Sequence, residues 1–353
     1  MKLGFGLYRH QLYSDHYRFA RQCGASHLVI HWVDYFRSSR GNQSGDQPVG
    51  DDSGWGLAGD PNQLWSCDEL LQVKADAASH GLEIAAIENF DPAHWYDVLL
   101  DGPQKAAQLE NLKALVRTVG RAGIPVIGYN FSIAGVAGRV KGPWGRGGAE
   151  VVCMEAAYDK PIPKGMVWNM VYNKDAVPDL LPSISTEELW RRHGDFLDAI
   201  VPVAEEAGVT LAAHPDDPPM PTVRGQPRLV NQPALFQRLL DRYPSPRNAL
   251  EFCLGTIAEM TDGDIYEAVD TYSRQQSIAY IHFRNIRGKV PHYQETFVDE
   301  GDIDMLRVLR ILKENDFRGV LIPDHAPQMT CLAPWHAGMA YACGWMQAAL
   351  RLL

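Results

Sequence analysis

The sequence has few cysteines and no long apolar run. Its six cysteines are spread over 353 residues without a Cys-x-x-Cys pair. That spacing argues against a disulfide framework and makes each cysteine, by default, a small buried apolar residue. No segment reaches the length of a transmembrane helix, and the start, Met1–Gly6, leads to Arg9 and His10 without the apolar core of a signal peptide. We therefore expect a protein of the cytoplasm, without a membrane partner.

A basic run is also absent. The chain has 33 Lys and Arg against 43 Asp and Glu, a formal net charge of −10. Such a chain is a poor partner for nucleic acid or an anionic membrane, and an acidic substrate would need locally placed cations. Hydrophobic residues make up 46% of the chain, enough for a sizeable core. Nine Trp and fourteen Tyr leave a homo-oligomeric interface open.

Short apolar runs alternate with amphipathic segments along the whole chain, which predicts eight strands and eight helices. The expected strands are Leu3–Tyr8, His27–Trp32, Leu82–Ile87, Pro125–Tyr129, Thr210–Ala213, Ala249–Phe252, Ile278–His282 and Gly319–Ile322. The expected helices are Asp15–Cys23, Cys67–His80, Pro103–Ala122, Thr186–Ala207, Gln232–Tyr243, Asp264–Gln275, Asp302–Asn315 and His336–Leu353. This order favours an α/β (β/α)₈ TIM barrel spanning residues 1–353 as a single domain. A doubly wound sheet would want a G-x-G-x-x-G after the first strand, and none is there.

Two insertions interrupt the alternation, near residues 37–61 and 132–182. Both follow strands, so both would lie at the end of a barrel where enzymes keep their active sites. Long loops at that end are often lids, although a passive surface loop is the alternative. Trp144, Trp168 and Tyr172 argue against full disorder in the second insertion.

Polar residues follow four consecutive strands. His214 ends the fifth strand and precedes Pro215-Asp216-Asp217, Cys253 follows the sixth, His282 ends the seventh and Asp324 follows the eighth. In a parallel barrel these positions meet at one end of the axis. Each residue alone has an ordinary reading, such as a satisfied histidine, an inert thiol or a capping carboxylate. Together, two imidazoles, a thiolate and a carboxylate predict a site for Mn²⁺, Fe²⁺ or Zn²⁺ rather than Mg²⁺, which avoids thiolate.

Other residues beside these ligands suggest the chemistry. His325 would stand next to Asp324, and an imidazole suits proton transfer near neutral pH. Arg284 would project near the metal, where a guanidinium can hold a substrate carboxylate. Asp216 and Asp217 are either acid–base groups or orienters of the metal-bound histidine.

These residues resemble the mannonate dehydratase family, whose members have a xylose-isomerase-like TIM barrel. The resemblance is best from about Ala107 to Asp324. Its motifs are His214-Pro215-Asp216-Asp217-Pro218-Pro219, Gly225-Gln226-Pro227-Arg228-Leu229, Cys253-Leu254-Gly255, His282-Phe283-Arg284-Asn285, Gln294-Glu295, Gly301-Asp302-Ile303-Asp304-Met305, Pro323-Asp324-His325, Ala122–Val126 and Tyr129-Asn130-Phe131.

The resemblance implies that His214, Cys253, His282 and Asp324 hold Mn²⁺ or Fe²⁺ and that His325 is a catalytic acid–base residue, with Asp216 and Arg284 as further catalytic candidates. Its candidate substrate-binding residues are Arg284, Asn285, Asn130, Glu295 and His336. The implied reaction belongs to hexuronate catabolism: D-mannonate loses its C2 proton and C3 hydroxyl, and the enol becomes 2-keto-3-deoxy-D-gluconate. It needs a base, a proton for the hydroxyl and a metal for the developing charge.

The chain departs from the family pattern around the substrate. Ala326-Pro327 follows His325 where a glycine is usual, Trp335 or His336 replaces an expected tyrosine, and Ser132–Arg139 differs from the usual Trp-Thr-Arg pattern. The expected activity is therefore a metal-dependent sugar-acid dehydratase. An isomerase, epimerase or lyase acting on a related sugar is the alternative, and a non-catalytic sugar- or metal-binding protein is a third.

Overall fold

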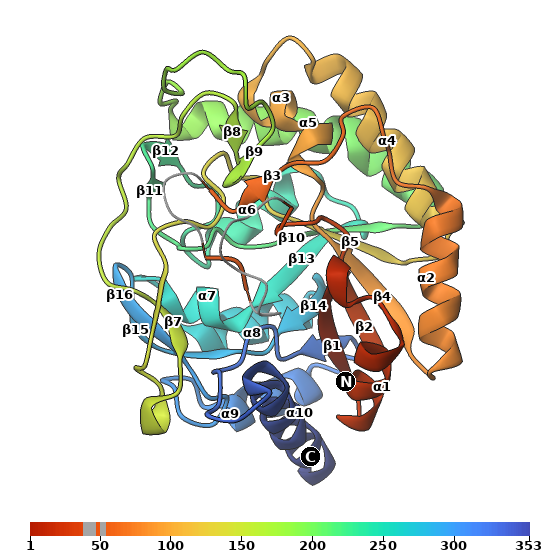
Figure 1. The fold of residues 1–353 in the computed structure, drawn as a ribbon, viewed down its shortest axis with the longest axis vertical. Helices are drawn as coiled ribbons and strands as arrows, with labels where there is room; N and C mark the ends of the chain where they lie inside the picture. The colour runs from red at the N-terminus through yellow and green to blue at the C-terminus, as the bar shows by residue number, and fades with distance from the viewer. Residues whose placement is uncertain (38–46, 50–53) are drawn as a thin grey trace.

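The computed structural model describes residues 1–37, 47–49 and 54–353. Eight parallel strands form a closed barrel in the order β1, β2, β4, β5, β10, β13, β14, β17 and back to β1 (Figure 1). Their bounds are Lys2–Tyr8, His27–His31, Glu83–Glu88, Val126–Tyr129, Thr210–Ala213, Asn248–Cys253, Ile278–His282 and Val320–Ile322. The predicted barrel and all eight predicted strands are confirmed.

Eight helices follow the barrel strands close to their predicted bounds. They are α1 (Ser14–Gln22), α2 (Cys67–Ser79), α4 (Lys105–Arg121), α5 (Thr186–Ala207), α6 (Leu235–Arg242), α8 (Ile265–Arg274), α9 (Met305–Glu314) and α10 (Pro334–Leu352). The predicted start of α5 is confirmed, because the Ser185 side chain accepts a hydrogen bond from the Glu188 backbone N–H. Its end is confirmed at Gly208, whose left-handed φ of 70° favours glycine. No described helix is long and apolar enough to cross a membrane.

A layer of apolar side chains lies inside the barrel, below the polar residues at the strand ends. This layer consists of Val29, Ala86, Ala212, Tyr280, Val320 and Ile322. Because alternate residues of a strand face the same side, Ala86, Ala212 and Tyr280 lie one layer below Glu88, His214 and His282. The outer faces of the strands pack on the helices in a larger core.

Short helices and strands that the sequence did not predict occupy the connections. The helices are α3 (Tyr96–Leu100) and α7 (Leu254–Glu259), with single 3₁₀ turns η1 (Arg9–Gln11), η2 (Pro92–His94) and η3 (Arg146–Gly148). The strands are β3 (Gly56–Leu57), β6 (Val140–Gly142), β7 (Val151–Met154), β8 (Met166–Val167), β9 (Met170–Val171), β11 (Thr222–Val223), β12 (Gln226–Pro227), β15 (Asn285–Lys289) and β16 (His292–Thr296). Most are two to five residues long, too short for a periodic signal.

These strands tie the two insertions together and to the barrel. β3 of the first insertion pairs with β9 of the second in a sheet ordered β3, β9, β8. A second sheet, ordered β15, β16, β7, β6, joins the later insertion to the hairpin after β14 (Figure 1). Residues 38–46 and 50–53 of the first insertion lie outside the described residues. The single-domain organisation and the role of the insertions as active-site loops stay predictions.

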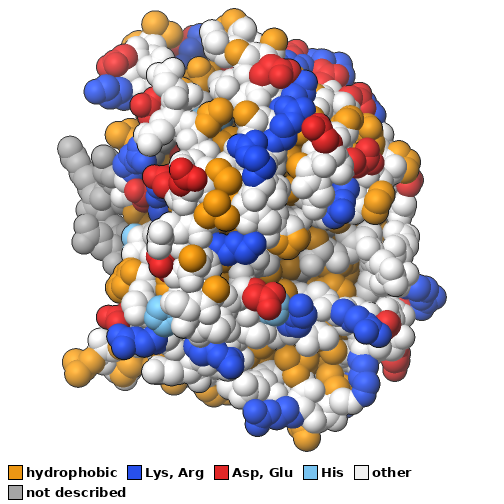
Figure 2. Space-filling view, turned by 90° about the vertical axis from the view of Figure 1, so that its right-hand side faces the viewer, with side chains coloured by type: hydrophobic (Ala, Val, Ile, Leu, Met, Phe, Trp, Pro, Cys, Tyr) orange, Lys and Arg blue, Asp and Glu red, His pale blue; other side chains and the backbone are white. Residues whose placement is uncertain are grey.

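The outer surface mixes charges of both signs. Figure 2 shows Lys and Arg side chains interspersed with Asp and Glu over the face it presents, with apolar side chains between them. Exposed ion pairs of the described residues include Arg274 with Asp270 and Arg18 with Asp15. Exposed pairs of this kind contribute little to stability, and their mixture creates no large field of one sign on this face.

Candidate active site

A cavity opens at the carboxyl ends of the barrel strands. Its lining residues come from the strand ends and from both insertions: Tyr8, His31, Tyr35, Gln47, Pro48, Trp55, Glu88, Asn89, Asn130, Val136, Arg139, Trp168, His214, Asp217, Glu251, His282, Asp324 and His325. Aromatic, acidic and imidazole side chains therefore face one space, as in a site for a small polar molecule.

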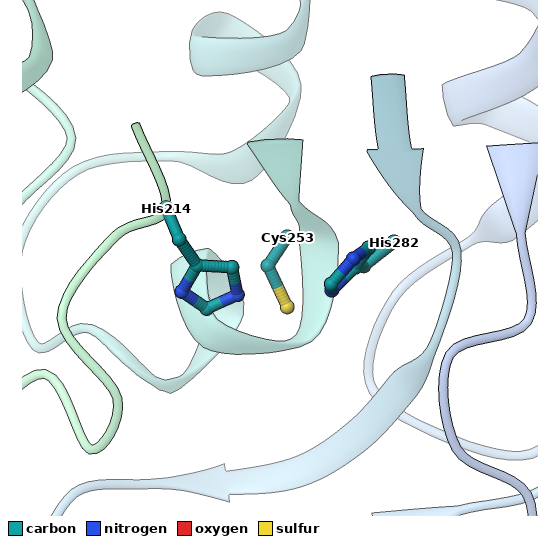
Figure 3. A group of neighbouring side chains, drawn as sticks. All are labelled: His214, Cys253 and His282. Atoms are coloured by element: carbon teal, nitrogen blue, oxygen red, sulfur yellow. The ribbon is translucent and has the colours of Figure 1, made fainter. Parts of the chain in front are cut away.

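Three of the four predicted metal ligands converge at this cavity, which His214 and His282 line while Cys253 lies buried behind them. Donor atoms of His214, Cys253 and His282 lie within 4.8 Å of one another, and their side chains point toward a common space (Figure 3). Strand pairing aligns them, since Cys253 of β13 lies opposite His282 of β14. Asp324 is adjacent, with its Oδ2 3.4 Å from His282 Nδ1. Its left-handed φ of 61° is unusual for a residue other than glycine, and such strain is often found at functional sites.

The protonation and hydrogen bonding of these donors suit a divalent transition metal. His214 Nδ1 donates a hydrogen bond to the Pro215 carbonyl at 2.6 Å, which leaves Nε2 able to bind an ion. Burial alone would raise the pKa of the Cys253 thiol, but the Arg284 guanidinium and the neighbouring His214 and His282 rings hold that pKa well below its usual value. Neither ring nitrogen of His282 has a partner in good hydrogen-bond geometry among the described residues. Two imidazoles and a thiolate therefore fit Mn²⁺, Fe²⁺ or Zn²⁺.

His325 lines the same cavity and is held by Glu295. Its Nδ1 lies 3.1 Å from Glu295 Oε1, and its Nε2 lies 3.4 Å from Asp324 Oδ1. Burial lowers the pKa of His325, but Asp324 and Glu295 together raise it above its ordinary value. Glu295 also accepts a hydrogen bond from Gln47 Nε2 at 2.7 Å. Glu295 itself does not line the cavity, so its contact with the site passes through His325.

Arg284 lies near the cavity, and its guanidinium is paired with carboxylates of the protein. Its guanidinium contacts Glu259 Oε1 at 2.8 Å, Asp217 Oδ2 at 3.1 Å and Asp324 Oδ2 at 3.3 Å. The residue is 3% exposed and is not a lining residue. This placement contrasts with the expected hold on a substrate carboxylate, because the planar donor fork already faces three carboxylates.

The structure also places Asp216, Asn285 and His336 outside the lining of the cavity. Asp216 Oδ2 accepts hydrogen bonds from the Leu229 and Val230 backbones, which holds the loop after β10. The Asn285 amide donates to the Val298 and Ile303 carbonyls. The His336 ring packs against Phe19 and Trp335. Asn130 does line the cavity, although its amide donates to the Pro215 carbonyl and accepts from Trp168 Nε1.

Arg139 is a lining residue that the sequence did not single out. Among the described residues it is the only Lys or Arg that lines the cavity. Its Nη1 lies 3.8 Å from both Asp217 and Glu295, and its Nε has no hydrogen-bond partner among the described residues. Burial lowers its pKa, but Asp217, Tyr293 and Glu295 raise it above the ordinary value, so the group is cationic. It lies in an insertion without periodicity, and no sequence signal marked it.

Two acidic lining residues also went unpredicted, although each had a signal. Glu88 ends β4 directly after the apolar run Ile84–Ile87, the same pattern that drew attention to His214. Glu251 lies within buried β13, two residues before Cys253 and therefore on the same side of the strand. Glu88, Glu251 and His282 form a second group of donor atoms within 4.8 Å of one another.

Comparisons with known proteins agree with this fold and identify a family. The barrel matches that of the 3-keto-D-glucoside 4-epimerase of E. coli with a TM-score of 0.57 over 99% of both chains, at 12% sequence identity, a likeness of fold alone. The profile of the D-mannonate dehydratase (UxuA) family matches residues 28–140 and 156–342. The closed eight-stranded barrel is thus a TIM barrel, and its fold is like that of the xylose isomerase domain protein from Planctomyces limnophilus, which is 12% identical with a TM-score of 0.55.

Particular relatives narrow the assignment. The mannonate dehydratase of Streptococcus equi subsp. zooepidemicus is 33% identical over 279 residues, 74% of this chain and 75% of its own. The crystal structure of mannonate dehydratase from Streptococcus suis serotype 2 matches 100% of this chain and 94% of its own, with a TM-score of 0.73 and 26% identity. This chain belongs to the D-mannonate dehydratase family and is a hydro-lyase of that family. The predicted family and enzyme class are confirmed.

Proposed function

We propose that this enzyme removes water from a sugar acid with the help of Mn²⁺ or Fe²⁺, and that D-mannonate is the first substrate to test. One observation carries the proposal: in a member of this family, the His214, Cys253 and His282 donors lie together, and both histidines line a cavity with His325 and a cationic Arg139. A metal-binding group, an acid–base group and a cation are the three elements that dehydration next to a carboxylate needs.

His214, Cys253, His282 and Asp324 would hold the ion. When bound there, a divalent cation polarises substrate oxygens and stabilises the negative charge that develops once the C2 proton is removed. Thiolate among the donors favours Fe²⁺, Mn²⁺ or Zn²⁺ over Mg²⁺. Hydrogen bonds to Cys253 Sγ from the Thr256 hydroxyl at 3.1 Å and its backbone N–H at 3.5 Å support the thiolate form.

His325 would move the proton. A carboxylate only accepts hydrogen bonds, so Glu295 fixes the proton of His325 on Nδ1 and leaves Nε2 to exchange a proton with the substrate. In the expected reaction the C2–H bond breaks, its electrons form the C2–C3 double bond and the C3 hydroxyl leaves as water after taking a proton. The resulting enol becomes 2-keto-3-deoxy-D-gluconate.

Arg139 would bind the carboxylate of the substrate in place of Arg284. Its guanidinium faces the cavity, whereas Arg284 is surrounded by Glu259, Asp217 and Asp324. A guanidinium matches the planar geometry of a carboxylate, and a local cation offsets the acidic character of the chain. We leave Asp216, Asn285 and His336 outside this proposal because their side chains engage other parts of the protein.

The test is an assay of the purified protein loaded with Mn²⁺, and separately with Fe²⁺ under nitrogen, against a panel of aldonates that includes D-mannonate. We expect a 2-keto-3-deoxy acid and one water per turnover. The metal-free protein is the control. Turnover of none of the acids, or exchange of a sugar proton with solvent deuterium without loss of water, would contradict the proposal, and the second result would favour an isomerase or epimerase.

A further inference from the structure

His282 is shared by two groups of donor atoms. One contains His214 and Cys253, and the other contains Glu88 and Glu251. A neutral imidazole has one nitrogen with a free lone pair and one that carries a proton. His282 can therefore ligate an ion through one nitrogen only, and the other nitrogen must donate a hydrogen bond.

The two ring nitrogens face different partners. Nδ1 lies 3.4 Å from Asp324 Oδ2, on the side of the proposed metal ligands. Nε2 lies 3.1 Å from Glu251 Oε1 and 3.3 Å from Glu88 Oε2. Carboxylates accept the second N–H of many metal-binding histidines and fix the orientation of the ring.

The interior of the barrel leaves space for these two carboxylates. Glu251 is 1% exposed and Glu88 is 6% exposed. A Cβ atom on Gly128 of β5 would lie 2.3 Å from Glu251 Oε2 and 2.2 Å from the Tyr280 hydroxyl, so the glycine makes room for both groups. Oε1 and Oε2 of Glu251 and Oε2 of Glu88 have no partner in good hydrogen-bond geometry among the described residues. These oxygens are therefore available to accept a hydrogen bond from His282.

We propose that Glu251 and Glu88 are positioning residues that accept the Nε2 proton of His282 and so direct its Nδ1 toward the metal ion. Glu251 lies nearer to His282 Nε2 than Glu88 does, so it contributes more to orienting the ring. The inference rests on the proposed metal site and adds residues that do not bind the ion themselves. The competing possibility is that Glu88, Glu251 and His282 Nε2 hold a cation of their own.

The experiment is a titration of the metal-free protein with Mn²⁺, followed by the electron paramagnetic resonance signal of free Mn²⁺, for wild type, Glu251→Met and Glu251→Gln. Loss of the acceptor in Glu251→Met should raise the Kd by about 10- to 100-fold, with one ion bound per chain in both proteins. Glu251→Gln keeps an acceptor oxygen and should show a change of only a few-fold. Asp97→Asn, at another buried carboxylate, is the matched control and should leave the Kd unchanged.

Thermal unfolding of the metal-free proteins separates positioning from a structural role. Glu251→Met removes a buried carboxylate that is costly to desolvate, so its Tm should be equal to or above that of wild type while its metal binding weakens. An unchanged Kd, or a Kd and Tm that worsen together, would overturn the inference. Two ions in wild type and one in Glu251→Met would assign Glu251 as a ligand instead. Failure of wild type to bind Mn²⁺ at all would overturn the proposed metal-dependent function first.

Discussion

The ends of the barrel strands and the two insertions form two walls of one cavity, and their residues are held in different ways. Strand ends supply His214, His282 and Asp324, whose positions follow from the register of neighbouring strands. The insertions supply Arg139 and Trp168, which reach the cavity from loops joined by short strand pairs. The difference suggests that the strand wall serves the chemistry and the insertion wall selects the substrate.

The largest effect should follow a change in the strand wall. We expect Cys253→Ala to weaken Mn²⁺ binding by more than about 100-fold and to reduce dehydration to background, because a thiolate ligand is lost. Metal content of the purified variant and its turnover are the measurements. Cys343→Ala, at a buried cysteine in α10, is the control. Full metal occupancy of Cys253→Ala would contradict the ligand assignment.

A smaller but still large effect is expected at His325. His325→Asn should lower kcat by about 10²- to 10⁴-fold, the usual contribution of a general acid–base group. Metal content should stay near wild type, since His325 is not among the proposed ligands. The single-turnover rate with bound metal is the measurement. If every detected activity survived in this variant, the acid–base role would be wrong.

Arg139 and Arg284 provide a direct comparison of the two walls. We expect Arg139→Met to lower kcat/KM by roughly 10- to 100-fold, because a hydrogen bond between charged groups contributes about 1.5–3 kcal/mol. The main effect should be on substrate use, with metal content preserved. Steady-state kinetics with the preferred acid measures it. Wild-type kinetics in this variant would remove Arg139 from the substrate site.

Arg284→Met is the matched variant on the other side of the comparison. Here the expected loss is in stability, about 3–5 kcal/mol, since Glu259 and Asp217 would be left as buried carboxylates without their cation. Denaturant unfolding measures it. If this variant kept wild-type stability and lost only the binding of the sugar acid, Arg284 rather than Arg139 would be the substrate-binding arginine.

The smallest expected effect lies outside both walls. His193 of α5 is fully buried, and burial lowers its pKa to about 3. The unfolded chain then binds a proton that the folded chain does not, so stability falls as pH falls below about 6.5. Between pH 7 and pH 5, the unfolding free energy of His193→Phe should therefore fall by about 2 kcal/mol less than that of wild type. Unfolding free energies at the two pH values test this, and equal losses would contradict it.

Periodicity in the sequence predicted the barrel well. Runs such as Thr210–Ala213 and helices such as Thr186–Ala207 match the structure to the residue, because local apolar patterns and capping residues determine them. The proposed metal ligands were predicted from the same strands, since a polar residue at the end of each strand lies at the mouth of the barrel. Glu251 was missed although it precedes Cys253 by two residues and so faces the same side of β13, because a single acid inside an apolar strand does not by itself indicate a site.

The sequence by itself determined the barrel, the family and the proposed metal ligands, all of which depend on short-range patterns and on parallel strands that end together. Only the tertiary structure decided which side chains face the cavity. Arg284 and Arg139 are both arginines near acidic residues, yet Arg284 is enclosed by three carboxylates while Arg139 lines the cavity. That distinction depends on contacts between segments more than 65 residues apart, such as Asp217 with Arg284, which no local pattern encodes.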